Sequence, residues 1–220
     1  STVFRSGYAV MHGETSWALV RFPYFRFRPS HNDVFHFDLW SKGHNILCDA
    51  GTFSYNPPPE SRVPDLRSVH SHNTVSFDGR EQMPSLSRFL LGNWLTADET
   101  DIIERGSNGC KSWKGSYTDS NGNRHSRKIS VQDNNWTVED KLEGRFKKAE
   151  IGFNIDDPDC LLQEGKVKGS FGCIDLPENA QVSLGDTFVS GFYIEMHKVQ
   201  RLTIEVSEPG VYVTSISLGR

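Results

Sequence analysis

The fold of this chain is constrained most strongly by a series of short segments in which apolar and polar residues alternate, as they do in β-strands. Turn residues separate these segments. Residues 16–22 and 34–40 have this pattern, and Phe35, Phe37 and Leu39 share one face of the second segment. Further segments of this kind lie at 46–49, 73–77, 126–132, 136–142, 148–154, 167–171, 181–184, 192–198, 201–206 and 211–218. No long helical period and no internal repeat interrupts them. The pattern indicates an all-β sandwich or barrel.

Two connections between these segments have distinct turn chemistry. Residues 41–45 combine Ser, Lys, Gly, His and Asn between two strand-like segments, which predicts a β-hairpin. Residues 56–64 contain four prolines, which force an extended backbone and cannot pair in a central strand. We therefore expect residues 56–64 to cross the surface as a loop.

Composition excludes several classes of protein. Hydrophobic residues make up 36% of the chain and charged residues 24%, as in globular domains with a core. The formal charge of −4 gives no basic surface for nucleic acid, and no apolar run approaches the ~20 residues of a membrane span. The four cysteines form no C-x-x-C pair, which argues against a zinc ribbon. We expect Cys48 to be a buried free thiol. The sequence does not decide whether Cys160 and Cys173 form a disulfide.

Potential metal ligands are concentrated near the beginning of the chain. Six of the eight histidines lie within the first 72 residues, together with several aspartates. Imidazole and carboxylate groups are common ligands of Zn²⁺. His31, Asp49 and His72 would meet if the predicted hairpin and the following strand are neighbours, although spacing alone does not establish this. The alternative is that these side chains only satisfy buried hydrogen bonds.

Four motifs in this region occur in a specific order. They are H-x-D at 31–33, L-x-x-x-G at 39–43, D-x-G-T-x-x-Y at 49–55 and H-N-T-V-x-x-D-G at 72–79. In this order they resemble the signature block of heparinase II/III-like proteins, a family of polysaccharide lyases. The resemblance is specific over residues 6–90 and looser over 125–140, and the last 60 residues carry no signature.

The resemblance implies both a fold and a metal site. Residues 1–220 would form a C-terminal two-sheet antiparallel β-sandwich of the supersandwich type, with little helix. An N-terminal α/α toroid would precede it in a larger protein. A divalent metal, usually zinc, would be held by His31, Asp49 and His72 and would act mainly on stability.

The implied activity is β-elimination on a uronate-containing acidic polysaccharide, of the kind that includes glycosaminoglycans. A base removes the proton next to the uronate carboxylate, while that carboxylate is neutralised. The family's sandwich contributes a histidine two positions before the metal histidine, but this chain has Pro29 there. Either His70 takes its place, or the toroid supplies every acid and base, or the protein does not catalyse.

Substrate binding has candidate residues of its own. The guanidinium groups of Arg28 and Arg67 match carboxylate and sulfate geometry, and Tyr55 is placed to stack on a sugar face. The ordinary alternatives are that the arginines only decorate the surface and that the aromatic ring packs in the core.

Two other classes of function compete with a lyase. One is a non-catalytic domain that binds acidic carbohydrate, or an inactive relative of the lyases, which Pro29 favours. The other is a cupin-type metallo-oxygenase, although the H-x-H pair typical of such sites is interrupted by the same proline. The family context suggests a bacterial protein that is periplasmic or secreted, although free cysteines fit poorly with an oxidising compartment.

Overall fold

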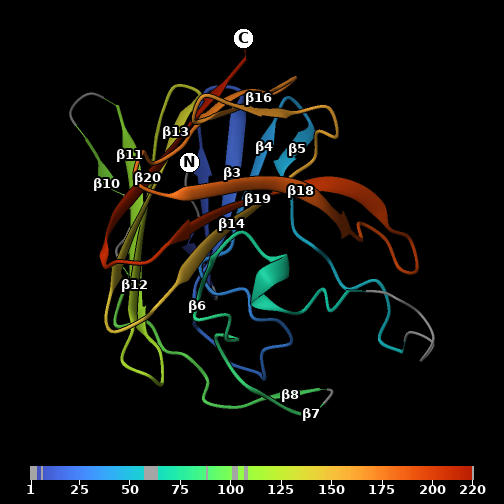
Figure 1. Ribbon diagram of the computed structural model, residues 1–220, viewed down its shortest axis with the longest axis vertical. Helices are drawn as coiled ribbons and strands as arrows, with labels where there is room; N and C mark the ends of the chain where they lie inside the picture. Colours follow the sequence, from blue (N-terminus) through green and yellow to red (C-terminus); the bar gives the residue numbers. More distant parts are fainter. Residues whose placement is uncertain are drawn as a thin grey trace.

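Two antiparallel sheets pack face to face in this protein (Figure 1). We describe it from a computed structural model of the 220-residue chain, in which residues 4–5, 7–56, 64–87, 89–100, 104–106 and 109–219 are described. Within these ranges the only helical segment is a single 3₁₀ turn, η1 (Val69–Ser71). The predicted all-β sandwich with little helix is confirmed.

The first sheet has nine strands in the order β1-β2-β3-β4-β5-β14-β19-β18, with β6 also paired to β14. Its strands are β1 (Phe4–Arg5), β2 (Tyr8–His12), β3 (Ser16–Arg21), β4 (Phe37–Ser41), β5 (His44–Leu47), β6 (Val75–Phe77), β14 (Ala149–Ile155), β18 (Gln181–Val189) and β19 (His197–Val206).

The second sheet also has nine strands, in the order β10-β11-β12-β13-β20-β17-β16-β15, with β9 paired to β11. Its strands are β9 (Glu99–Thr100), β10 (Glu104–Arg105), β11 (Lys111–Thr118), β12 (Arg124–Gln132), β13 (Asn135–Glu143), β15 (Leu161–Gln163), β16 (Lys166–Gly169), β17 (Gly172–Asp175) and β20 (Gly210–Leu218). A separate small hairpin joins β7 (Ser85–Ser87) to β8 (Leu90–Leu91).

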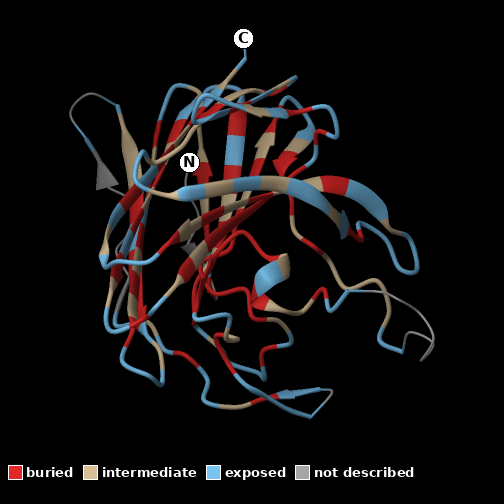
Figure 2. Cartoon of the chain, in the orientation of Figure 1, coloured by how far each residue is buried: buried red, intermediate tan, exposed pale blue. Residues whose placement is uncertain are grey.

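The core lies between the two sheets and follows from the alternation of each strand. In β13, for example, Trp136, Val138 and Leu142 are fully buried while their neighbours are more exposed. Figure 2 shows the same alternation along the strands of both sheets. Burial of each large apolar side chain contributes about 1.5–3 kcal/mol, so this shared interior holds the sheets together.

The first sheet is split beside β14, and this split positions the candidate site. One end of β14 pairs with β6, whereas its other end pairs with β5 only through Ile155. The buried amide of Asn73 fills the gap between them. Its Nδ2 donates to the carbonyls of Phe37 (2.9 Å) and Cys48 (3.1 Å), and its Oδ1 accepts from the Asn154 backbone N–H (2.6 Å). The start of β4, the end of β5 and the start of β6 therefore meet at one place.

The predicted hairpin at 41–45 is confirmed, but some strand predictions were wrong in detail. The hairpin joins β4 to β5 through Lys42 and Gly43, both in the left-handed region as a two-residue hairpin turn requires. The strand predicted at 192–198 begins only at His197, because the preceding residues form the turn that connects β18 to β19.

Two further predictions concern the cysteines and the proline-rich loop. All four cysteines are free and Cys48 is buried, so Cys160 and Cys173 form no disulfide. In the predicted surface loop 56–64, residues 57–63 lie outside the described residues. Over the described part of the chain, no helix has the length and apolar character needed to cross a membrane.

Candidate functional site

Three loops at the split bring two imidazoles and a carboxylate together. His36 lies immediately before β4, Asp49 lies just after β5, and His72 lies between η1 and β6. Oδ2 of Asp49 is 3.2 Å from Nδ1 of His72 and 3.4 Å from Nε2 of His36. One nitrogen or oxygen atom of each residue lies within 4.8 Å of the other two, which is close enough to surround a single metal ion.

The two imidazoles of this cluster are buried and incompletely hydrogen-bonded. His72 is 0% exposed and His36 is 4% exposed. Nδ1 of His72 and Nε2 of His36 make no hydrogen bond of acceptable geometry, although both lie near Asp49. Buried polar atoms without a partner cost free energy, and they often mark a missing ion or water. The carboxylate of Asp49 and the unpaired Nδ1 of His72 therefore fit a divalent metal.

Burial and neighbouring charges set the ionisation of the cluster. Burial lowers the pKa of His36 to about 3, so this imidazole is neutral at physiological pH. Although burial alone would raise it, the adjacent His36 and His72 rings hold the pKa of Asp49 well below its usual range. A neutral imidazole beside an ionised carboxylate is the protonation state that metal binding requires.

The structure brings the predicted ligands His31, Asp49 and His72 together, but His31 and Asp49 lie beside different nitrogens of the His72 ring. Nδ1 of His31 lies 3.1 Å from Nε2 of His72, whereas Asp49 lies beside the other nitrogen, Nδ1. The remaining nitrogen of His31 lies 3.3 Å from Oγ1 of Thr52. Binding of one ion by all three requires His31 and Asp49 to face the same nitrogen of His72.

Sequence reasoning did not select His36 as a member of the cluster. Its Nδ1 accepts a hydrogen bond from the Asn73 backbone N–H (3.0 Å), so the proton of the neutral ring lies on Nε2, facing Asp49. In this state Nε2 of His36 carries a proton 3.4 Å from Oδ2 of Asp49, without a hydrogen bond of acceptable geometry, and it has no lone pair to offer an ion. The clustering of histidines within residues 31–72 was the sequence signal that could have identified His36. The strand pattern of residues 34–40 did not indicate that this side chain would face Asp49.

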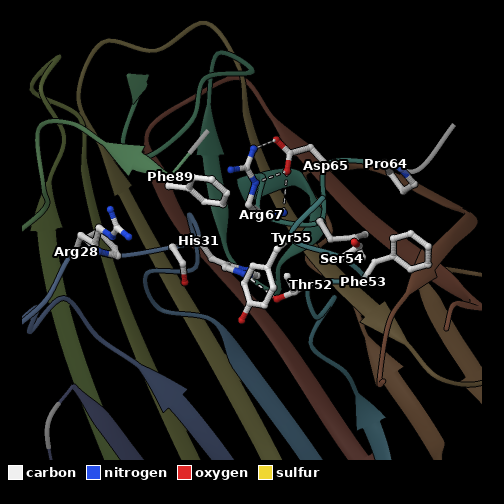
Figure 3. A pocket seen from close by; sticks show the side chains of 13 residues that line it. Arg28, His31, Thr52, Phe53, Ser54, Tyr55, Pro64, Asp65, Arg67 and Phe89 are labelled. Atoms are coloured by element: carbon white, nitrogen blue, oxygen red, sulfur yellow. Dashed lines mark hydrogen bonds and ion pairs between the residues drawn. The ribbon is translucent and has the colours of Figure 1, made fainter. Parts of the chain in front are cut away.

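A large pocket opens beside this cluster. Its volume is about 390 Å³, and Figure 3 shows side chains from residues 28–31, 52–55 and 64–67 and from the hairpin residue Phe89 around it. The lining residues are Arg28, Pro29, Ser30, His31, Thr52, Phe53, Ser54, Tyr55, Pro64, Asp65, Leu66, Arg67 and Phe89. All three residues predicted to bind substrate, Arg28, Tyr55 and Arg67, line this pocket. His31 is the only histidine in its lining among the described residues.

The pocket combines positive charge with exposed aromatic rings. Arg67 is paired with Asp65 through its Nε (3.0 Å) and Nη2 (3.2 Å), so part of its charge is balanced locally. Tyr55 is 69% exposed, and its ring lies 6.3 Å from that of Tyr193 in the turn after β18. Arginines and an accessible aromatic face suit an anionic sugar.

His70, the candidate substitute for the missing catalytic histidine, lies elsewhere. Its Nδ1 is 3.3 Å from Oε2 of Glu150, and its Nε2 is 3.4 Å from the Gly79 carbonyl. It lines a separate cavity of about 120 Å³ together with Arg201, on the outer face of the first sheet. Its backbone N–H donates to Oγ of Ser68 (3.3 Å), and His70 is not among the residues that line the large pocket.

Comparison with known proteins identifies relatives of this chain. Residues 4–214 match the family model described as heparinase II/III-like, C-terminal. Similar solved structures include a heparinase III gene product (TM-score 0.79, 15% identity, covering 97% of this chain and 35% of that one). Heparan sulfate lyase HepC from Pedobacter heparinus is also similar (TM-score 0.75, 16% identity, covering 97% of this chain and 35% of that one).

A structure of heparinase III has the same fold (TM-score 0.76, 15% identity), and 97% of this chain covers 36% of it. At these identities the likeness to solved structures shows a shared fold. The comparison with curated protein sequences gives no significant match. The chain thus spans about a third of the length of the solved relatives.

Proposed function

Because the chain belongs to the heparinase II/III-like C-terminal family, we propose that it is one domain of a polysaccharide lyase that cleaves uronate-containing acidic polysaccharide by β-elimination. The observation that carries this proposal is the pocket lined by Arg28, Arg67 and Tyr55 beside the His72 cluster. An acidic glycan is the substrate that this surface suits, and we propose a periplasmic or secreted location for the protein.

The pocket supplies contacts for an anionic sugar. A guanidinium forms charge-assisted, bidentate hydrogen bonds with a carboxylate or a sulfate, and these are stronger than bonds between neutral groups. Arg28 makes no ion pair with any described residue, so its charge is available to a ligand. The Tyr55 ring offers a face on which a pyranose stacks.

The reaction needs groups that the sandwich does not supply at position 29. Pro29 lines the pocket but has neither a side-chain proton nor a backbone N–H to donate. The proposal therefore assigns the base to an N-terminal α/α toroid of the same protein, which would also contribute groups that neutralise the uronate carboxylate. This domain orders the substrate, and by itself it should give no turnover.

A divalent metal, with zinc as the best match to the donor set, would be bound by His31, Asp49 and His72. When bound it supplies a positive charge that fixes the three loops and adds to the stability of the fold. His36, whose Nε2 lies 3.4 Å from Oδ2 of Asp49, would then be placed to orient the ligating carboxylate, as groups around metal sites commonly do. The unpaired, fully buried Nδ1 of His72 supports binding by His72 and Asp49, whereas His31, which lies beside Nε2 of His72, would have to face the same nitrogen as Asp49 to join them.

The decisive experiment compares this 220-residue domain with a longer protein that includes the upstream coding region. Both are incubated with uronate-containing glycans of different sulfation, and the unsaturated product is followed by its ultraviolet absorbance. We expect product from the longer protein only, and less of it from its Arg28→Ala variant. A longer protein that cleaves no acidic glycan would refute the lyase proposal.

The same experiment tests the second candidate, a non-catalytic domain that binds acidic carbohydrate. Pro29 is the specific observation that favours it, because it removes a protonatable side chain from the pocket. Binding of acidic oligosaccharides by both proteins, with cleavage by neither, would select this alternative.

A further inference from the structure

A fully buried arginine reaches from the second sheet to the loops that carry the histidine cluster. Arg127 lies on β12 and is 0% exposed. Its Nη1 donates to two backbone carbonyls of the first sheet's loops, those of Phe35 and Asn73, each at 2.7 Å. These residues are the chain neighbours of His36 and His72. One side chain thus ties together the two segments that hold both buried imidazoles.

The guanidinium of Arg127 is held rigidly from the side of its own sheet. Its Nε donates to Oδ1 of Asp140 (2.7 Å) and its Nη2 donates to Oδ2 (2.9 Å). Asp140 lies directly opposite on β13, and its Oδ1 is also 2.7 Å from Nε2 of His125. A bidentate pair of this kind fixes the plane and the direction of the guanidinium.

The segments that Arg127 contacts lie outside the named strands, where the Phe35 N–H donates to the Arg21 carbonyl (2.7 Å) and the Phe37 N–H donates to the Asn73 carbonyl (3.3 Å). Phe35 has φ = 62°, in the left-handed region, where a bulky residue persists only when its surroundings hold it. Asn73 lies in the gap where the first sheet is split, and its carbonyl has Arg127 as a partner. Removal of Arg127 would take this donor from the Phe35 carbonyl and leave the Asn73 carbonyl with the longer hydrogen bond from the Phe37 N–H (3.3 Å), so both segments should become less ordered.

A second arginine, from the first sheet, holds the neighbouring carbonyl of the same segment. Nη1 of Arg201, on β19, donates to the His72 carbonyl (3.0 Å) and to Oδ1 of Asn154 (2.9 Å). Gly152 makes room for this side chain, because a Cβ at that position would lie 1.8 Å from Nη2 of Arg201. The consecutive carbonyls of His72 and Asn73 are therefore held by two arginines, one from each sheet.

We propose that Arg127, fixed by Asp140, is a positioning residue that sets the spacing of His36 and His72 across the split in the first sheet. This inference rests on the proposed function in so far as His72 is a metal ligand. It adds that part of the site's geometry is determined from the opposite sheet, by residues of 125–140 that do not touch the ion or the substrate.

The test uses two substitutions at the same position. Arg127→Lys keeps the charge beside Asp140, but one ammonium group cannot satisfy the carboxylate and both carbonyls. The second variant combines Arg127→Met with Asp140→Asn, because removing one partner of the buried Arg127–Asp140 pair alone would be strongly destabilising. The combination leaves no unpaired buried charge, and the asparagine side chain still offers His125 a hydrogen-bond partner. Asp157→Ala is the control, because Asp157 is buried and its hydrogen bonds to Asp159 and Ser170 lie apart from the cluster.

Two readouts are measured on proteins shown by circular dichroism to be folded. The first is Zn²⁺ affinity, from competition with a chromophoric chelator. The second is amide hydrogen exchange of residues 32–37 and 72–75 without metal. We expect both Arg127 variants to bind Zn²⁺ at least tenfold more weakly, in the range seen when supporting groups around a metal site are removed. Exchange should accelerate in both segments, whereas the control should change neither.

The outcomes separate the two levels of the proposal. Folded Arg127 variants with wild-type Zn²⁺ affinity and unchanged exchange would overturn the positioning role while leaving the metal site intact. A wild-type protein that binds no Zn²⁺ would refute the metal part of the proposed function. Hydrogen exchange would still decide in that case whether Arg127 orders the two segments.

Discussion

Nδ1 of His72 lies 3.2 Å from Oδ2 of Asp49, and the histidine is fully buried while the aspartate side chain is 39% exposed. The pair therefore joins an interior imidazole to a carboxylate that solvent reaches. A cation entering from the Asp49 side would meet an ionised oxygen first and a buried nitrogen behind it. Loss of the His72 imidazole should consequently impair metal binding the most.

We predict that His72→Ala abolishes Zn²⁺ binding, that His31→Ala weakens it by more than tenfold, and that His36→Gln weakens it less. Glutamine retains a donor toward Asp49, whereas alanine at 31 or 72 removes a ligand. Isothermal titration of metal-free protein measures the three affinities. A larger loss from His36→Gln than from His31→Ala would assign the third ligand to His36 instead.

The metal should also stabilise the fold by mass action. An ion bound only by the native state at 100 times its dissociation constant adds about 2.7 kcal/mol to the free energy of unfolding. We expect chelation to lower the Tm of the wild-type protein and to leave that of His72→Ala unchanged. An unchanged wild-type Tm, after metal loss is verified by elemental analysis, would argue against a stabilising ion.

Arg28 should contribute more to binding of an acidic oligosaccharide than Arg67 does. The charge of Arg67 is partly balanced by Asp65, whereas Arg28 has no ion pair with a described residue. We expect Arg28→Ala to raise the Kd for a uronate oligosaccharide about tenfold, a loss of about 1.4 kcal/mol. The loss for Arg67→Ala should be smaller. Titrations at two salt concentrations measure both, and equal losses would contradict this ranking.

The side chain of Asn73 should contribute several kcal/mol to the free energy of unfolding. It makes three side-chain hydrogen bonds in the gap between β5, β6 and β14, and it is fully buried. Because each buried group left without a partner costs about 1–3 kcal/mol, we expect Asn73→Ala to lower the free energy of unfolding by about 3 kcal/mol or more. Urea denaturation checks this, with the exposed Asn121→Ala as a control that should change little.

The sequence predicts the neighbourhood of the site better than its internal geometry. The motif order around His31, Asp49 and His72 places these residues in adjacent loops, and the structure brings them together. The role of His36 was not predictable in this way. Its orientation depends on the left-handed turn at Phe35 and on a backbone N–H of Asn73, and both are set by tertiary contacts.

Two strands show where pattern reasoning fails. Residues 111–118 form β11 but were not predicted, because a glycine and two lysines interrupt the apolar alternation. Gly115 is needed there, since a Cβ would lie 2.9 Å from the Trp113 ring and 3.0 Å from that of Phe35. In the opposite case, the aromatic run from Phe192 suggested a strand, but these side chains are exposed in a turn beside Tyr55.

The buried pair of His125 and Asp140 should make stability depend on pH in a defined direction. Burial holds the pKa of His125 below its ordinary value of 6.5, despite the opposing effect of Asp140. Burial opposes ionisation of Asp140, but Arg127 and His125 lower its pKa to about 2. Below pH 6.5 the unfolded chain therefore protonates residue 125 while the folded protein does not, so the unfolded state binds more protons and stability falls as the pH falls.

We predict that this loss is smaller in His125→Gln, which keeps a donor for Asp140 but cannot titrate. The slope specific to His125 is at most about 1.4 kcal/mol per pH unit, so the stability of the wild type relative to the variant should decrease between pH 6.5 and 4.5. Below pH 3.8 both proteins should also lose the contribution of Asp140, whose carboxylate is protonated first in the unfolded chain. Urea denaturation in the presence of a chelator measures both profiles. Parallel profiles from pH 7 to pH 4.5 would show that the folded protein takes up a proton at His125 as readily as the unfolded chain does.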